Sequence, residues 1–110
     1  MWKIAQREGV SVFGTSAKYL AAIEKSGLQP KESFKLPKLK TILSTGSTLL
    51  PEQYDFVYRG IKEEVCLSSI SGGTDIVSCF ALGCPITPVY RGELQVMGLG
   101  MDVKLSLIHI

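Results

Sequence analysis

The chain has 110 residues, of which 45% are hydrophobic and 20% are charged, a composition typical of a globular protein. This length allows one small domain at most, with fewer strands and covering helices than a parallel α/β enzyme domain usually contains. The formal net charge is only +2 and the lysines are scattered among acidic residues, which argues against a nucleic-acid-binding surface.

Cysteine usage predicts reduced thiols and therefore a cytosolic protein. The three cysteines (Cys66, Cys79 and Cys84) are odd in number and form no CxxC pair. Charged residues interrupt the apolar positions at the N-terminus, which does not resemble a signal peptide. No stretch approaches the roughly 20 apolar residues that span a bilayer. Three scattered thiols and one distant histidine do not supply the about four ligands of a zinc site.

The spacing of apolar residues predicts alternating helices and strands along the first part of the chain. In chain order we expect a helix that ends near Gly9, a strand over 10–13, a loop over 14–16, a helix over 17–26 and a polar loop over 28–37. Thr15 or Ser16 is a good N-cap for the second helix, and Gly27 suits the position after its C-terminus.

The same order of elements then repeats. We expect a strand over 39–43, a loop over 44–48, a helix over 51–59, a third strand over 65–70, a loop over 71–75, and further strands over 76–82 and 92–96. Pro51 suits the first position of its helix, and Glu52 lies in the positive first turn. Strands joined by helices predict right-handed crossovers, and therefore an α/β fold that contains part of a parallel sheet with flanking helices.

Each of the three expected parallel strands ends in a segment rich in glycine or hydroxyl side chains. The segments read GTS at 14–16, STGST at 44–48 and SISGGT at 69–74. Parallel α/β sheets bind ligands beyond the carboxyl ends of their strands, and such loops let backbone N–H groups approach a phosphate or a planar ring. The three segments therefore predict a ligand site at one edge of the sheet. STGST lacks the following Gly-Lys of a P-loop, which argues against a P-loop NTPase.

The segment SGGTD at 71–75 contains groups that suit both a phosphate and a metal ion. The hydroxyl of Thr74 could donate to a phosphate oxygen, and the carboxylate of Asp75 could bind Mg²⁺. A glycine-rich turn capped by Asp75 accounts for the same spacing equally well.

Longer stretches resemble the adenylate-forming superfamily of acyl-CoA synthetases, luciferases and peptide-synthetase adenylation domains. The resemblance is carried by ILSTGSTLLPEQYDFVY at 42–58 and SISGGTDIVSCF at 69–80. The forms FGTSAKYL, STGSTL, SISGGTDI and RGELQVMGLGM are most similar to members that activate acetoacetate. The resemblance covers 1–104, and it implies an internal fragment, a partial AMP-dependent synthetase domain.

The resemblance implies a reaction in two steps. The acid attacks the α-phosphate of ATP to give an acyl-adenylate and pyrophosphate, and the thiol of coenzyme A then displaces AMP to give acetoacetyl-CoA. The family's Gly-Lys phosphate loop, ribose-binding aspartate and lid lysine lie outside this sequence. We therefore expect the chain alone to be inactive.

The resemblance also implies roles for individual residues. Gly46, Ser47 and Thr48 occupy the place of the turn that packs against adenine. Thr74 matches the threonine that contacts the α-phosphate, and Asp75 matches the glutamate that binds Mg²⁺. The expected nucleotide-binding residues are Gly46, Ser47, Thr48, Ser69, Ile70, Ser71, Gly72, Gly73 and Thr74.

The acyl group is expected near Gly72, Gly14 and Thr15. Gly72 stands where acetate-specific relatives carry a tryptophan, and glycine there leaves room for a longer acid such as acetoacetate. Two alternatives stay open: a ligase for another short-chain acid, and a non-catalytic nucleotide-binding or interaction module.

The last six residues, LSLIHI at 105–110, resemble the translation of a sequencing adapter. The alternative is a β-strand, since VKLSLIHI alternates apolar and polar residues. We expect 105–110, including His109, to have no part in function.

Overall fold

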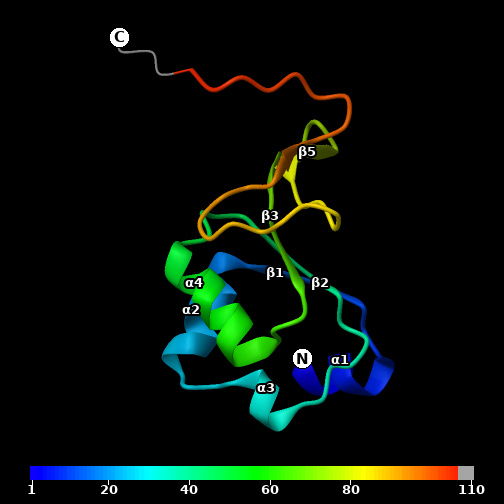
Figure 1. The fold of residues 1–110 in the computed structure, drawn as a ribbon, viewed down its shortest axis with the longest axis vertical. Coiled ribbons are helices and arrows are strands. Elements are labelled where there is room, and N and C mark those ends of the chain that lie inside the picture. The colour runs from blue at the N-terminus through cyan, green and yellow to red at the C-terminus, as the bar shows by residue number, and fades with distance from the viewer. Residues whose placement is uncertain (107–110) are drawn as a thin grey trace.

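The computed structural model describes residues 1–106, which form two small sheets and a set of helices (Figure 1). The first sheet is parallel with the order β1-β2-β3, and its strands are β1 (Val12–Ser16), β2 (Thr41–Thr45) and β3 (Cys66–Ser69). The second sheet is antiparallel with the order β4-β5-β6, and its strands are β4 (Ser71–Gly73), β5 (Ser78–Leu82) and β6 (Val96–Met97). The predicted α/β fold with a parallel sheet is confirmed.

The same residues, 1–106, also form four α-helices and one π-helix. They are α1 (Trp2–Glu8), α2 (Ala17–Lys25), α3 (Pro30–Ser33), α4 (Pro51–Phe56) and the π-helix η1 (Val57–Ile61), which continues α4 directly. As predicted, α1 ends at Gly9, whose φ of 63° is left-handed, and α4 begins at Pro51. The π-helix was not predicted; it contains the bond from the Lys62 N–H to the Val57 carbonyl at 3.0 Å. Within residues 1–106, every helix is too short or too polar to cross a membrane.

The core lies between the parallel sheet and the helices. Phe13, Ile42 and Leu67 are neighbours in register on the three strands, and all three are buried. Trp2 of α1 stacks on Phe13 with ring centroids 4.5 Å apart. Full burial of each such side chain contributes about 1.5–3 kcal/mol, so this row is a main source of stability.

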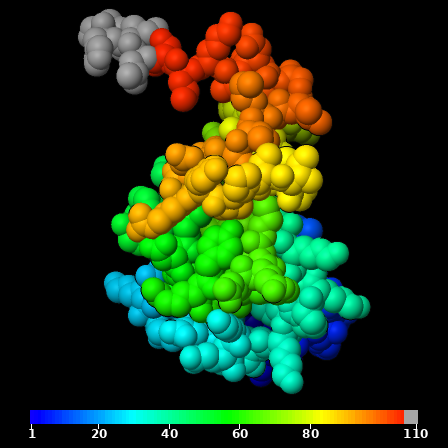
Figure 2. Space-filling model, viewed as in Figure 1, coloured from blue at the N-terminus to red at the C-terminus, as the bar shows by residue number. Residues whose placement is uncertain are grey.

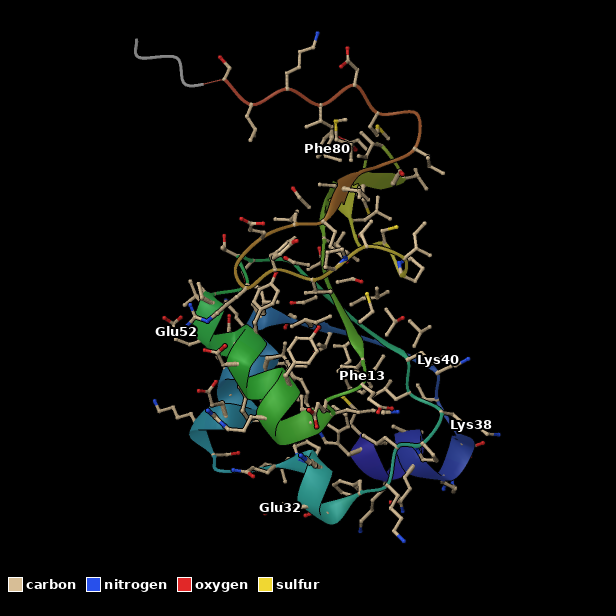
Figure 3. The ribbon with its side chains drawn as sticks, viewed as in Figure 1. Phe13, Glu32, Lys38, Lys40, Glu52 and Phe80 are labelled. Atoms are coloured by element: carbon tan, nitrogen blue, oxygen red, sulfur yellow. The ribbon has the colours of Figure 1, made fainter. Side chains whose placement is uncertain are left out.

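The second sheet lies beyond the carboxyl ends of the parallel strands and projects from the helical body (Figures 1 and 2). Figure 3 shows the contrast: Phe13 lies within the body, whereas Phe80 lies on the projecting sheet. Phe80 is 42% exposed and Phe13 only 7%. The residues that follow β6 run onward as an extended segment, and 107–110, with His109, lie outside the described residues.

All three segments expected to be loops after the parallel strands contain strand residues: 14–16 lie in β1, 44–45 in β2 and 71–73 in β4. Residues 14–16 continue β1, because they pair in register with 43–45 of β2. Ser16 then caps α2 directly, since its Oγ accepts a hydrogen bond from the N–H of Tyr19 at 3.2 Å and an N-cap residue is itself extended. Residues 71–73 form β4 because they pair with β5.

Candidate functional site

The carboxyl ends of β2 and β3 border a hollow of about 400 Å³. Its lining comes from three segments of the chain: Thr45, Gly46, Ser47, Thr48 and Leu49; Ser69, Ile70, Ser71 and Gly72; Gly92 and Leu94. The structure therefore brings together the second and third of the segments that follow the parallel strands. Gly92 and Leu94, from much later in the chain, form a further part of the lining.

Backbone and hydroxyl groups hold the first two segments together. The N–H of Ile70 donates to the carbonyl of Ser44 at 2.8 Å, and the hydroxyl of Thr45 donates to the carbonyl of Ile70 at 3.3 Å. Gly46 follows with a φ of 88°, a left-handed conformation that favours glycine, and a Cβ added there would meet nothing within 4 Å. A ligand can therefore approach the backbone at Gly46 closely.

A row of hydroxyl side chains crosses the parallel sheet beneath this hollow. Thr15, Ser44 and Ser69 are neighbours in register on β1, β2 and β3. Ser44 is 1% exposed, and within the described residues its Oγ has no hydrogen-bond partner. Burial raises the pKa of Tyr54 on α4, and a hydrogen bond that its phenol oxygen accepts from Ser69 lowers this pKa by a smaller amount.

Most of the expected nucleotide-binding residues line the hollow; the exceptions are Gly73 and Thr74. Gly73 ends β4, and Thr74 begins the exposed turn to β5, in which the N–H of Val77 donates to the carbonyl of Thr74 at 3.2 Å. Asp75 lies in the same turn and is exposed. Gly14 and Thr15, expected near the acyl group, lie within β1 and do not line the hollow.

Gly72 has a structural constraint of its own. A Cβ at this position would lie 2.8 Å from the carbonyl oxygen of Ser78 and 3.3 Å from the Cα of Cys79. The pairing of β4 with β5 is irregular between Ser71 and Gly72, which is where this close approach occurs. The absence of a side chain is therefore required by the hairpin, independently of any acyl group.

Thr45 lies within the predicted STGST segment, and three lining residues lie outside the predicted segments: Leu49, Gly92 and Leu94. The string RGELQ, which contains the last two, was part of the sequence resemblance, but nothing local in it indicates a ligand. Gly92 and Leu94 reach the hollow because residues 91–94 pack against α4. The hydroxyl of Tyr54 donates to the carbonyl of Glu93 at 2.9 Å.

None of the lining residues carries a charge, and this limits what the hollow can bind. Leu49, Ile70 and Leu94 provide apolar surface, whereas the serine and threonine hydroxyls and the backbone provide hydrogen bonds. Three apolar side chains together with hydroxyl and backbone hydrogen-bonding groups suit an uncharged, planar ligand group.

Within residues 1–106 no cluster of three or more metal-ligating side chains exists. Asp75 is a single exposed carboxylate. Mg²⁺ commonly takes one or two carboxylates and completes its shell with phosphate and water oxygens. The donor set fits an ion that arrives with a nucleotide, and it does not fit a metal site built from protein ligands alone.

The sequence of the chain is similar to the sequences of known proteins. No family model matches the chain. The chain is 54% identical over 105 residues to acetoacetyl-coenzyme A synthetase from Rhizobium meliloti, which covers 96% of this chain and 16% of that protein. It is 38% identical over 108 residues to malonamoyl-CoA synthetase from Penicillium aethiopicum, which covers 94% of this chain and 15% of that protein.

A solved structure agrees with these relatives. Acetoacetyl-CoA synthetase from Streptomyces lividans matches with a TM-score of 0.79 and 41% identity, over 90% of this chain and 16% of that one. The fold thus matches a part of an adenylate-forming acyl-CoA synthetase. The particular protein to which this part is similar is acetoacetyl-CoA synthetase, of which the chain spans about 16% of the length.

Proposed function

We propose that this chain is a segment of an enzyme that activates acetoacetate with ATP and transfers the acetoacetyl group to coenzyme A. The products are acetoacetyl-CoA, AMP and pyrophosphate. The observation that carries the proposal is the 54% identity to the Rhizobium meliloti synthetase over 96% of the chain, which includes every segment that lines the hollow.

In this proposal the hollow receives the adenosine part of ATP. The uncharged lining supports this assignment, because adenine is planar and uncharged, and the backbone around Gly46 is open to it. The phosphates extend toward the turn after β4, where the hydroxyl of Thr74 donates to the α-phosphate. The acyl group lies near Gly72, with Gly14 and Thr15 of β1 as further neighbours.

Asp75 is the residue that we propose for Mg²⁺. When bound, the ion neutralises charge on the phosphates. The exposed carboxylate of Asp75 would contribute one oxygen ligand to this ion. Asp75 follows directly after Thr74, so in this proposal both side chains lie beside the phosphates of the same ATP molecule.

We further propose a cytosolic enzyme that acts on small molecules. The three cysteines within the described residues are free thiols, as expected in a reducing compartment. Acetoacetate, ATP and coenzyme A are its substrates.

A second candidate substrate is malonamate, because one relative is a malonamoyl-CoA synthetase. Acetoacetate and malonamate share a carbonyl group at the same distance from the carboxylate. They differ only at the end of the molecule, where one has a methyl group and the other an amide nitrogen. A pocket that admits one therefore admits the other sterically.

The test uses the full-length enzyme that contains this chain. It is incubated with ATP, Mg²⁺ and coenzyme A, together with acetoacetate, malonamate, acetate or butyrate, and acyl-CoA and AMP are measured. We expect the highest kcat/KM for acetoacetate. A higher kcat/KM for malonamate, acetate or butyrate would show instead that the enzyme is a ligase for that acid. AMP binding without turnover of any acid would show that the protein is a non-catalytic nucleotide-binding module.

A further inference from the structure

Residues 91–94, which we call the strap, are held on α4 by contacts at successive positions. The Nε of Arg91 donates to both carboxylate oxygens of Asp55 at 3.0 Å, and its Nη2 lies 2.9 Å from Asp55 Oδ2. Two positions later, the carbonyl of Glu93 accepts a hydrogen bond from the hydroxyl of Tyr54 at 2.9 Å. Tyr54 and Asp55 are adjacent residues of α4, so one turn of helix anchors the strap at two positions.

Gly92 lies between these two anchors and is close to the start of the same helix. Its φ is 82°, and a Cβ there would lie 3.1 Å from the Cγ of Pro51. Pro51 is the first residue of α4. The strap is thus fitted to the first turns of α4 by shape as well as by hydrogen bonds.

The anchored residues alternate with the residues that line the hollow. Arg91 and Glu93 contact α4, whereas Gly92 and Leu94 form part of the wall of the hollow. A second part of the wall is the 45–49 segment, which is followed after one residue by α4. One helix therefore sets the distance between two walls of the hollow.

The ion pair between Arg91 and Asp55 fixes the orientation of the strap more than it stabilises the folded protein. The side chains of Arg91 and Asp55 are 55% and 49% exposed, and pairs of this kind contribute little to the free energy of folding. A guanidinium that donates two hydrogen bonds to one carboxylate nevertheless has a fixed orientation. Tyr54, by contrast, is 3% exposed, so its hydrogen bond to the strap is protected from water.

We propose that Asp55, Arg91 and Tyr54 are positioning residues, which hold the strap as a wall of the nucleotide site and so set the affinity for the adenine nucleotide. This inference rests on the proposed function, because it assumes that the hollow binds the adenosine part of ATP. None of the three residues lines the hollow itself.

The test measures AMP binding by calorimetry and the KM values for ATP and acetoacetate in the full-length enzyme. Arg91→Gln should raise the Kd for AMP and the KM for ATP by about twofold to fivefold, the effect of losing an interaction of this strength. The KM for acetoacetate should stay unchanged. Arg7→Gln is the matched control, because Arg7 also pairs with an exposed carboxylate, that of Glu8, on α1.

Three further variants complete the test. Exchanging the pair, as Asp55→Arg with Arg91→Asp, should restore most of the lost affinity. Arg91→Lys retains the charge and loses the two-pronged geometry, so it should fold and still weaken AMP binding. Tyr54→Phe removes only the hydroxyl that holds Glu93, and it should raise the Kd for AMP while the KM for acetoacetate stays unchanged.

The outcomes separate the two proposals. If the unaltered enzyme binds no AMP, the proposed function is wrong. If it binds AMP, and Arg91→Gln, Arg91→Lys and Tyr54→Phe bind it equally well, the positioning role is wrong. Equal increases in both KM values, or no recovery in the exchanged pair, would also overturn the positioning role.

Discussion

Gly83 lies so close to Ser68 that a Cβ at position 83 would overlap the Ser68 hydroxyl. Ser68 is a buried residue of β3, and Gly83 follows β5, so this contact fixes the second sheet against the first. The glycine is therefore required by a close approach between two elements.

Gly83→Ala should accordingly destabilise the protein. Adding a methyl group to a packed contact forces the strands apart, and overpacking of this kind commonly costs about 1–3 kcal/mol. Urea unfolding measures the effect. Gly14→Ala is the control, since a Cβ at Gly14 meets nothing within 4 Å, and equal stability of the two variants would contradict the contact.

Val77→Gly should stabilise the protein. Val77 has a φ of 50°, which a β-branched residue adopts only with strain, and its side chain is 90% exposed, so little packing is lost. Release of the strain should raise the free energy of unfolding by about 1 kcal/mol. Val12→Gly is the control: Val12 is a half-exposed strand residue, and its replacement should destabilise. Destabilisation by Val77→Gly as well would show that the strain is absent.

The stability of the protein should fall in alkaline solution partly because of Tyr58. Burial raises the pKa of Tyr58 above its ordinary value of 10.0, and a backbone hydrogen bond from Leu67 lowers it by a smaller amount. The folded state therefore favours the neutral phenol. This contribution is complete below pH 10.0 and is lost as the pH rises through the pKa of the folded state.

Melting temperatures between pH 8 and pH 11, roughly the range over which tyrosine titrates, check this prediction. Tyr58→Phe should flatten the alkaline decline. An unchanged decline in Tyr58→Phe would exclude the tyrosine as its source.

Asp75→Asn should weaken the dependence of ATP binding on Mg²⁺ in the full-length enzyme. The variant retains the shape of the turn and removes the charge that we propose for the ion. Adenylation should slow by a factor on the order of 100, about 2.7 kcal/mol of barrier. Titration of ATP binding with Mg²⁺ provides a readout besides turnover. Asp102→Asn, which removes another exposed carboxylate, is the control.

Local signals in the sequence identified much of the fold. Pro51 at the start of α4 and Gly9 after α1 act through their own backbone conformations, so these two helix ends could be predicted from the local sequence alone. The strand at 71–73 was missed because serine and glycine have no preference for strands, and only pairing with β5 makes them one.

The candidate site was predictable where it follows the parallel strands. Gly46 and Gly72 stand out in short glycine-rich segments. Gly92 and Leu94 could not be found in the same way. They reach the hollow through contacts with α4, about 40 residues earlier in the chain, and such contacts exist only in the folded protein.

The π-helix at 57–61 has a consequence for how relatives of this chain align with it. Each π turn contains more residues than an α turn, so a helix that is α throughout would cover the same distance with fewer residues. Tyr58 lies in this widened turn, where its hydroxyl accepts the hydrogen bond from the N–H of Leu67 at 3.2 Å. An alignment gap confined to 57–61 would therefore mark homologues that lack the insertion, and with it this link between helix and strand.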